Sequence, residues 1–534
     1  MATIEADPDH VPTKQEIRLV ITASSLGTVF EWYDFFIYGT LAASGIIGRV
    51  FFPAGNEVVQ TLLAWAGFAV GFGFRPLGAV LFGYLGDRLG RKYTFLVTIT
   101  LMGIATAGVG LIPSYASIGM LAPILVLLLR IAQGLALGGE YGGAAIYVAE
   151  HAPPGKAGFY TSFIQAGVVG GFILSLAVVL ATKAAVPVAA WEGGWWRFPF
   201  LFSIVLLLVS LWMRLKLHES PVFARMRAAG TRAKNPLKES FTYPGNIRRM
   251  LVALFGIAAG LTVVWYTAMF SILSFLQTTV RVEETTAQLL AGAGALMGLG
   301  WFVLFGHLSD KWGRKKPIVL GYVLTLIFLF PIFWLMASAA NPALARAAER
   351  APVIVSGPNC AYSPFAAQQA DRCGRLLDYL SKKGIPYEKR ATPATVVTIG
   401  GITLMDPTPA HLDTALAAAG YDLGKVRPPF ANILLILVAI VAMAALSGMT
   451  YGPVAALLSE MFPPAIRYSS LSIPYHIGTG YFGGFLPFIS QYVVARTGDP
   501  FSGLWYTWGV TLLALIVIVI GLDERKLASA DTIE

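Results

Sequence analysis

The chain has 534 residues, of which 56% are hydrophobic and 13% are charged, and its formal net charge is +10. Since a soluble protein is normally about a quarter charged, this composition excludes an ordinary soluble enzyme and indicates a protein solvated mainly by lipid. Apolar runs recur along the chain, each long enough to cross the bilayer as a helix. They lack the short period-two alternation of barrel strands.

Twelve membrane-spanning helices are predicted, in an all-α membrane protein of two pseudo-symmetric six-helix bundles. The first twenty residues carry acids and lack the basic start of a signal peptide, so we expect the first apolar run to remain as helix one. The predicted spans are 18–47, 57–84, 94–113, 117–149, 157–183, 196–216, 250–280, 286–307, 317–339, 430–459, 468–496 and 502–522.

The basic residues predict how these helices cross the membrane. Lys and Arg gather in the links that follow even-numbered helices, and cytoplasmic links carry such an excess. This pattern explains the positive charge better than nucleic-acid binding does. We therefore expect both termini in the cytoplasm of a bacterial cell, with the protein in the inner membrane. The expected domains are a first bundle at 1–216, a cytoplasmic linker at 217–249, helices seven to nine at 250–340, an insert at 341–429, and helices ten to twelve with a tail at 430–534.

Two motifs occur once in each half. Residues 83–92 read GYLGDRLGRK, and residues 306–315 read GHLSDKWGRK. Helix four ends in VAEHAPP and helix ten in LSEMFPP. A repeat of this length, built from apolar helices, indicates two similar membrane halves.

Charged side chains of these motifs are predicted to form a gate at the cytoplasmic end. An aspartate there can face the N-terminus of an adjacent helix, and the arginines can hold the partner helix by ion pairs. Such contacts break when the halves rock apart. The alternative is a pair of ordinary basic turns. The candidate gating residues are Asp87, Arg88, Arg91, Glu150, Asp310, Arg314 and Glu460.

Residues 341–429 are much more polar than the rest and are expected to form a small α+β extracytoplasmic domain between helices nine and ten. Helix-like pieces lie at 371–383 and 409–419, and strand-like pieces at 352–356 and 395–402. The two cysteines of the chain, Cys360 and Cys373, lie here. A small domain in an oxidising compartment favours a disulfide over two free thiols. Two thiols and His411 leave a zinc tetrahedron incomplete, so no metal is expected.

The motifs resemble those of a known family. The duplicated loop and the RIAQG run at 130–134 resemble signatures of the major facilitator superfamily. GTVFEWYDFFIYG in helix one, GFRPLGAVLFGYLGDRLGRK in helix two, RIAQGLALGGEYGGA in helix four and WWRFPFLF followed by HESPVF at helix six look like its metabolite:proton symporters. That group includes α-ketoglutarate, citrate and shikimate permeases and the proline/betaine symporter. The resemblance covers nearly all of the chain except 341–429.

Charges inside the membrane cost about 2.5 to 3.5 kcal/mol each and therefore need a partner or a function. Glu31 and Asp34 are three residues apart and share one face of helix one, away from Trp32 and Tyr33. In proton-coupled relatives a helix-one acid beside the helix-four arginine is the proton site, so the resemblance implies that Asp34 carries the proton and interacts with Arg130. Glu31 is the alternative carrier. A fixed ion pair between helices one and four is the competing interpretation.

The substrate is expected to bind at buried cationic and aromatic residues. Arg75 can bind a carboxylate bidentately, and Glu140 is its expected partner when the site is empty. The resemblance also implies a role for Arg197, whose alternative is an interfacial anchor. His476 can titrate near neutral pH or be a satisfied core histidine. The candidate substrate-binding set is Arg75, Glu140, Tyr33, Arg197, Gln165, Tyr266, Tyr475 and His476.

These observations predict a proton-coupled secondary transporter of a small organic acid, not an enzyme, working by alternating access in the bilayer as a monomer. No cofactor beyond the coupling proton is expected, and nothing matches an ATP-binding P-loop. A zwitterionic substrate such as proline or betaine is the first alternative. A transporter-like sensor, or enzymatic activity in the insert, is the second.

Overall fold

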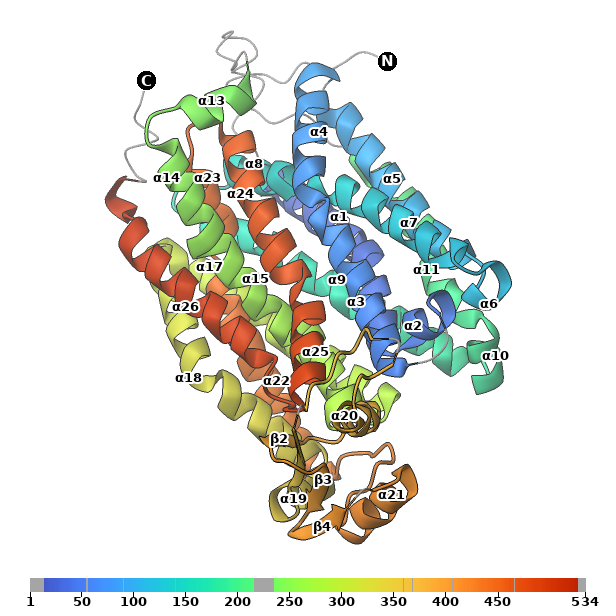
Figure 1. The fold of residues 1–534 in the computed structure, drawn as a ribbon. Coiled ribbons are helices and arrows are strands. Elements are labelled where there is room, and N and C mark those ends of the chain that lie inside the picture. The colour runs from blue at the N-terminus through green and yellow to red at the C-terminus, as the bar shows by residue number, and fades with distance from the viewer. Residues whose placement is uncertain are drawn as a thin grey trace.

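The structure is a computed structural model that describes residues 14–526 except 54–55, 90, 140, 216–234, 359, 367, 406 and 465. The side chains of residues 14–20, 83–84, 86–95, 214 and 236 also lie outside the description. The described chain is a long bundle of helices with a small sheet at one end, opposite α13 (Pro236–Thr242) (Figure 1).

The first half is helical throughout, and two of its predicted spans are interrupted. Helix two breaks at Phe74, because Pro76 lacks the N–H that would continue the helical ladder and is tolerated in the first turn of a new helix. Helix four ends its first part at Gly138 and resumes at Tyr141. The elements are α1 (Lys14–Ala43), α2 (Ile46–Phe51), α3 (Glu57–Gly73), α4 (Arg75–Leu89), α5 (Arg91–Leu111), α6 (Tyr115–Ile118), α7 (Leu121–Gly138), α8 (Tyr141–His151), α9 (Ala157–Ala185), α10 (Val188–Gly193), a 3-10 turn (Trp195–Arg197) and α11 (Phe198–Leu215).

The second half contains π-helical turns inside the predicted spans 250–280 and 468–496. These turns widen the helix locally and often lie at functional sites. They cover Val252–Ala258, Thr267–Ser271, Phe275–Thr279 and Gly478–Gly484. The other elements are α14 (Asn246–Leu251), α15 (Ala259–Tyr266), α16 (Ile272–Ser274), α17 (Glu284–Trp312), α18 (Lys315–Ala340), α22 (Phe430–Tyr451), α23 (Val454–Met461), α24 (Arg467–Ile477), α25 (Leu486–Thr497), α26 (Leu504–Gly521) and a 3-10 turn (Glu524–Lys526).

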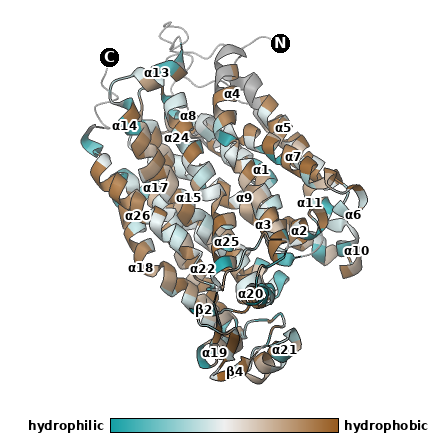
Figure 2. Ribbon diagram, viewed as in Figure 1, coloured by the Kyte–Doolittle hydropathy of each residue, from teal (hydrophilic) through white to brown (hydrophobic). Residues whose placement is uncertain are grey.

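Nine helical segments of the described residues are long and apolar enough to cross a membrane. The predicted span 94–113 corresponds to a shorter apolar stretch, Leu96–Leu111. Hydrophobic residues run along the length of the bundle helices, whereas α20 (Arg372–Lys382) is mostly hydrophilic (Figure 2). The composition and the helices together describe a multi-pass membrane protein.

The two halves meet along α9 and α17, which cross closely near one end. A Cβ built on Gly158 would lie 2.4 Å from the carbonyl oxygen of Gly306, and one on Gly306 would lie 2.7 Å from that of Gly158. Since real side chains never approach so closely, glycine at both positions permits the crossing. The loop motif that Gly306 opens is therefore held directly against α9.

Residues 342–418 form α19 (Pro342–Arg350), α20, α21 (Pro409–Ala418) and a four-stranded sheet. The strands are β1 (Val353–Gly357), β2 (Glu388–Ala391), β3 (Val396–Ile399) and β4 (Ile402–Met405), in the order β2-β1-β3-β4. β1 pairs in parallel with β2 and antiparallel with β3. Cys360 and Cys373 form a disulfide, in agreement with the prediction.

One strand predicted for the insert is wrong. The predicted strand 395–402 is a hairpin, in which β3 and β4 pair antiparallel across Gly400 and Gly401. Both glycines have positive φ, of 55° and 86°, which a two-residue hairpin turn requires. The insert has a hydrophobic core of its own, including Val355, Leu377 and Leu412.

Candidate functional site

Arg75 lies at the centre of the bundle, at the first residue of α4. It is fully buried, and its guanidinium carbon lies 5.1 Å from the ring centre of Trp32 and 5.2 Å from that of Phe72. Its Nη1 donates to Thr479 Oγ1, in the other half, at 3.3 Å. Its Nε and Nη2 have no hydrogen-bond partner among the described residues. Because unpaired buried donors are costly, these two nitrogens are suited to an anionic ligand.

Tyrosines from both halves meet beside Arg75. The rings of Tyr141 and Tyr475 stack with centres 3.9 Å apart and an interplanar angle of 4°. The hydroxyls of Tyr451 and Tyr475 are 2.8 Å apart, and Gln165 Nε2 donates to the Tyr141 hydroxyl at 2.7 Å. Gln165 and Tyr475 were predicted from the sequence, whereas Tyr141 and Tyr451 were not, because the chain alone does not distinguish them from core aromatics.

Arg75, Tyr451 and Tyr475 line a small central cavity of about 10 Å³, roughly the space of one water molecule. The conformation is therefore occluded, with the site collapsed around Arg75. Trp32 contributes to its wall although it lies on a different face of α1 from Glu31 and Asp34. The cavity is lined by Trp32, Arg75, Val168, Leu261, Thr262, Trp265, Tyr266, Tyr451, Tyr475 and Thr479.

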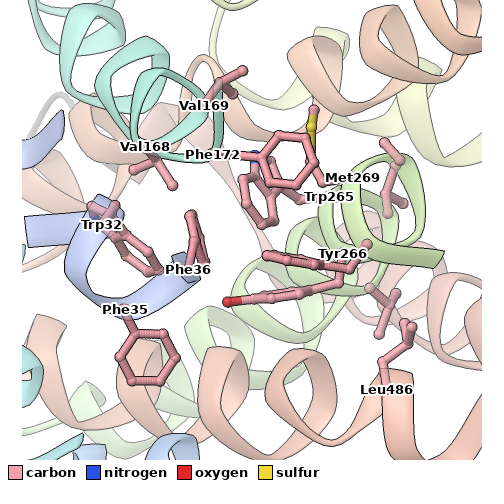
Figure 3. Packing of buried hydrophobic residues seen from close by; sticks show 14 of the residues in the cluster. Trp32, Phe35, Phe36, Val168, Val169, Phe172, Trp265, Tyr266, Met269 and Leu486 are labelled. Atoms are coloured by element: carbon pink, nitrogen blue, oxygen red, sulfur yellow. The ribbon is translucent and has the colours of Figure 1, made fainter. Parts of the chain in front are cut away.

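An aromatic cluster closes this cavity on the side of the insert. Phe36, one turn beyond Trp32 on α1, stacks on Trp265 with ring centres 5.1 Å apart. Its ring also lies 5.2 Å from that of Phe270. Figure 3 shows Trp32 and Phe36 on the side of α1 that faces Trp265 and Tyr266 of the second half, while the Phe35 ring points away from them. The barrier consists of side chains from both halves and therefore opens only if the halves separate here.

The candidate proton-coupling residues, Asp34, Glu31 and Arg130, are buried within the first half. Arg130 is fully buried and donates to Gln133 Oε1 at 2.7 Å and to the carbonyl of Phe35 at 3.4 Å. Gln133 Nε2 in turn donates to Thr106 Oγ1 at 2.6 Å and to the carbonyl of Asp34 at 3.4 Å. Arg130 therefore contacts helix one, as predicted.

A direct Asp34–Arg130 ion pair does not occur among the described residues, because carbonyl and amide oxygens occupy the guanidinium. Its remaining acceptors are the carbonyls of Gly67 and Phe68, both at 3.4 Å. Asp34 and Glu31 are themselves buried, with exposed fractions of 5% and 8%. In this conformation Asp34 thus connects to Arg130 through its backbone and Gln133.

Four predicted substrate residues do not line the cavity, namely Arg197, Tyr33, His476 and Gln165, which bonds instead to Tyr141. Arg197 Nη1 donates to the carbonyls of Gly110 and Ile112, at 2.9 and 2.5 Å, which cap the end of α5. This placement favours the anchor alternative over substrate binding. The Tyr33 hydroxyl donates to the carbonyl of Pro199 at 2.6 Å. His476 is buried with its ring centre 5.4 Å from that of Tyr475. Glu140 lies outside the described residues.

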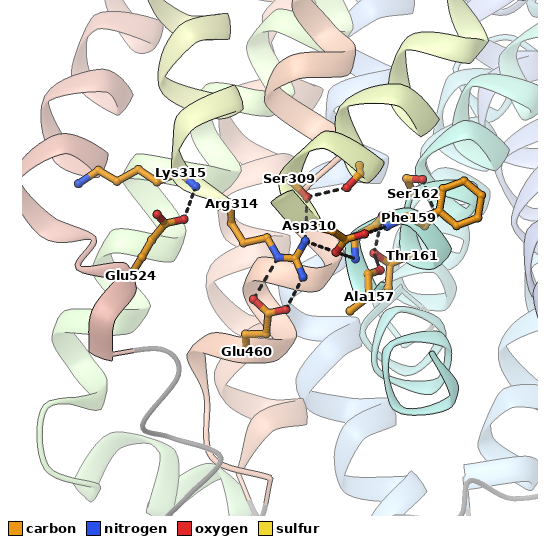
Figure 4. A network of polar contacts seen from close by, with 12 residues as sticks. Ala157, Phe159, Thr161, Ser162, Ser309, Asp310, Arg314, Lys315, Glu460 and Glu524 are labelled. Atoms are coloured by element: carbon orange, nitrogen blue, oxygen red, sulfur yellow. Dashed lines mark hydrogen bonds and ion pairs between the residues drawn. The ribbon is translucent and has the colours of Figure 1, made fainter. Parts of the chain in front are cut away.

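The predicted gating residues Asp310, Arg314 and Glu460 form a polar network with the first residues of α9 (Figure 4). The Asp310 carboxylate accepts the backbone N–H groups of Gly158 and Phe159 at 2.8 and 2.9 Å. Arg314 bonds to Asp310 at 2.6 Å and bidentately to Glu460 at 3.1 and 2.7 Å. The prediction that an aspartate of this motif faces a helix N-terminus is thus confirmed for Asp310.

Further contacts close the same end of the bundle. Glu150 of the first half lies 3.5 Å from Arg467 of the second, and the Tyr468 hydroxyl donates to the carbonyl of Gly139 at 3.0 Å. The predicted gating side chains Asp87, Arg88 and Arg91 lie outside the described side chains. The end opposite the insert is closed by contacts between halves, and the aromatic cluster closes the other.

Two helical halves with a buried polar site between them are the arrangement found in secondary membrane transporters. A family model for the Major Facilitator Superfamily matches residues 20–371. The chain belongs to this superfamily, whose members in these comparisons are transporters and not enzymes.

The relatives are metabolite transporters of bacteria. The inner membrane metabolite transport protein YhjE of Escherichia coli is 31% identical over 530 residues, covering 96% of this chain and 97% of that protein. The proline/betaine transporter of E. coli is 37% identical over 332 residues, covering 60% and 65%. The shikimate transporter of E. coli is 37% identical over 323 residues, covering 59% and 72%. The predicted resemblance to proline/betaine and shikimate transporters is confirmed.

Solved structures show the same fold. The partially occluded inward-open form of the xylose transporter XylE from E. coli aligns with a TM-score of 0.61. The alignment covers 96% of this chain and 99% of that one at 16% identity, and at that identity it concerns the fold alone.

Proposed function

We propose that the chain is a proton-coupled symporter that carries a small organic acid into the cell by alternating access. The observation that carries this proposal is Arg75, a fully buried guanidinium in a cavity shared by both halves, with two nitrogens unpartnered among the described residues. A carboxylate suits such a fork bidentately. The tyrosine hydroxyls beside it supply further hydrogen bonds.

The proposed topology has twelve spans in two six-helix bundles. Three further spans complete the twelve, in addition to the nine apolar helices. They are α1, the shorter α5, and α24 and α25, which together form one span. The insert is proposed as an extracytoplasmic α+β domain and both termini as cytoplasmic, in the inner membrane. Support comes from the basic residues of the links and from the disulfide, which suits an oxidising compartment.

Substrate binding and proton binding are proposed to share one conformational change. A substrate carboxylate binds Arg75 after the central cavity has opened, and the tyrosines of both halves then close around it. Asp34, or Glu31 as the alternative carrier, takes a proton when it is remote from Arg130 and is ionised when the two approach. The proton is the only coupling partner proposed, and the monomer is the proposed transporting unit.

The test is uptake by the purified protein in proteoliposomes with mono-, di- and tricarboxylates and with betaines. We expect a carboxylate to accumulate under an inward proton gradient. Asp34→Asn should abolish that accumulation but retain counterflow exchange, because exchange needs no net proton movement. Glu31→Gln is the matched variant. Accumulation that survives Asp34→Asn but not Glu31→Gln would assign the proton to Glu31.

A zwitterionic substrate is the second candidate, favoured by the buried acids near the site and by the named proline/betaine relatives. If betaine or proline accumulates and none of the tested mono-, di- or tricarboxylates does, the substrate is a zwitterion and not an organic acid.

A further inference from the structure

A second cavity, of about 850 Å³, lies between the insert and the adjacent ends of the membrane helices. Its walls include α18, the end of the span Asn246–Thr279, the loop after α20, and the loop between α25 and α26. It is far larger than the central cavity and shares no lining residue with it. Its volume lies in the range that binds small molecules.

One wall of the second cavity is apolar and belongs to the lipid-facing surface. Trp334 and Leu335 of α18 line it and are 69% and 37% exposed. α18 is an apolar span with two thirds of its most hydrophobic window outside the protein core. A residue so exposed on such a helix contacts lipid. The cavity therefore opens toward the bilayer, at the depth where the helices end.

The polar part of the second cavity contains the cations Arg281 and Lys425, together with the carboxylates Glu57 and Glu349. Arg281 and Lys425 line it, and neither forms an ion pair with a carboxylate of the described residues. Arg281 donates to the carbonyl of Lys383 through Nη1, while its Nε is buried without a partner among the described residues. Lys425 Nζ donates to the carbonyl of Gln277. Each cation thus uses one donor on a backbone carbonyl and has other N–H groups with which it can bind a ligand.

Burial disfavours these two positive charges. Partial desolvation lowers the pKa of Arg281 and that of Lys425, which the charge of Arg281 lowers further. Glu57 offsets part of this effect for both cations, as Asp422 does for Arg281 and Glu284 for Lys425. Of the other charged groups on the wall, Lys382 pairs with Asp378 at 2.6 Å. The remaining ones are Glu57 and Glu349. A negative charge between Arg281 and Lys425 would relieve their repulsion.

We propose that the second cavity binds one anionic glycerophospholipid of the leaflet beside the insert. The phosphate lies between Arg281 and Lys425, and the acyl chains run along Trp334 and Leu335 toward the bilayer. A soluble anion would satisfy the two cations but leave the apolar wall in water. An amphiphile satisfies both parts, as in other basic pockets at membrane helix ends. This inference does not depend on the proposed substrate or on proton coupling.

The test is native mass spectrometry of the full chain, purified in detergent and titrated with phosphatidylglycerol or phosphatidylcholine. We expect one phosphatidylglycerol to be retained in preference to phosphatidylcholine. R281Q/K425Q should weaken that binding by about tenfold or more, since two charge-assisted contacts are lost. Arg390→Gln is the control, because Arg390 is exposed on β2 and pairs with Glu388. Equal retention of both lipids, or unchanged binding by the double variant, would overturn the proposal.

A second measurement separates lipid from a soluble anion. Phosphatidylglycerol should raise the Tm of the wild-type protein, and glycerol phosphate should not. Equal stabilisation by glycerol phosphate would assign a soluble-anion site and overturn the lipid assignment. Arg281 also bonds to the insert, so the double variant can aggregate. In that case the single variant Lys425→Gln is measured instead. It should lose part of the lipid-dependent rise in Tm, and an undiminished rise would contradict the proposal.

Discussion

Arg75 shows how a single residue becomes a binding site. Arg75 is the first residue of α4, directly after the break in helix two, and Trp32 and Phe72 hold its guanidinium by their ring faces. These contacts orient the side chain without using its hydrogen-bond donors. The guanidinium of Arg75 is therefore already oriented toward the cavity before a ligand binds, which reduces the entropy lost on binding.

Arg75→Lys should weaken substrate binding while keeping the positive charge. Lysine cannot make the bidentate contact, and the loss of one charge-assisted hydrogen bond corresponds to about 10- to 100-fold in KM. The measurement is the concentration dependence of uptake in proteoliposomes. Arg197→Lys is the control, since Arg197 caps α5 away from the cavity, and its KM should change little. A similar rise in KM for both variants would argue against a specific role for Arg75.

The limits of prediction are clearest for residues whose partners lie in the other half. The sequence indicated that Arg75, Tyr266 and Tyr475 are buried and polar, because such residues are rare in apolar spans. It did not indicate Tyr141 or Tyr451, since a tyrosine that meets a partner across the interface looks the same in sequence as one packed in a core. The Asp34–Arg130 prediction gave the proximity but missed Gln133, whose amide lies between them.

At the scale of elements, periodicity and composition predicted most helices and the position of the insert. They did not predict the π-helical turns, which arise from tertiary packing rather than from apolar spacing. The hairpin at Gly400 and Gly401 was missed because two short strands with a two-residue turn read as one apolar run. The repeated loop motif was informative because its charges act on helix ends, a local effect that sequence position reveals.

Asp310→Asn should loosen the end of the bundle opposite the insert. Asparagine can still accept one N–H of α9, but it loses the charge that interacts with the helix N-terminus and with Arg314, an effect of about 1 kcal/mol. The closed state should become several-fold less favoured. The measurement is the rate at which a thiol reagent labels Ser472→Cys, a buried position packed against Gly142.

The control for this labelling experiment is Asp523→Asn. Asp523 is an exposed acid at the same end, whose carboxylate accepts the backbone N–H of Arg525. Its substitution should leave the labelling rate unchanged. If Asp310→Asn labels no faster than the parent, the bond between Asp310 and α9 does not hold this end closed.

At the scale of the whole molecule, the insert contacts both halves. It is attached to the second half through backbone bonds such as Tyr387 N to the carbonyl of Gly498, 3.2 Å, and through Arg281 and Lys425. It meets the first half where Asn56 Nδ2 donates to Asp378 Oδ1 at 3.1 Å. A domain joined to both halves resists their separation at its own end. The insert thus adds a restraint to the aromatic barrier.

Asn56→Asp should break this restraint without removing the cap of α3. Asn56 Oδ1 accepts the N–H of Val58, and aspartate caps equally well, but its charge repels Asp378. The second variant N56D/D378N places an amide opposite the new carboxylate and should restore the bond. Spin labels at Val188→Cys of α10 and Met405→Cys of β4, both exposed, report the separation by pulsed resonance. We expect a longer, broader distance distribution for the single variant and the original one for the double. An unchanged distribution in the single variant would show that this contact does not restrain the halves.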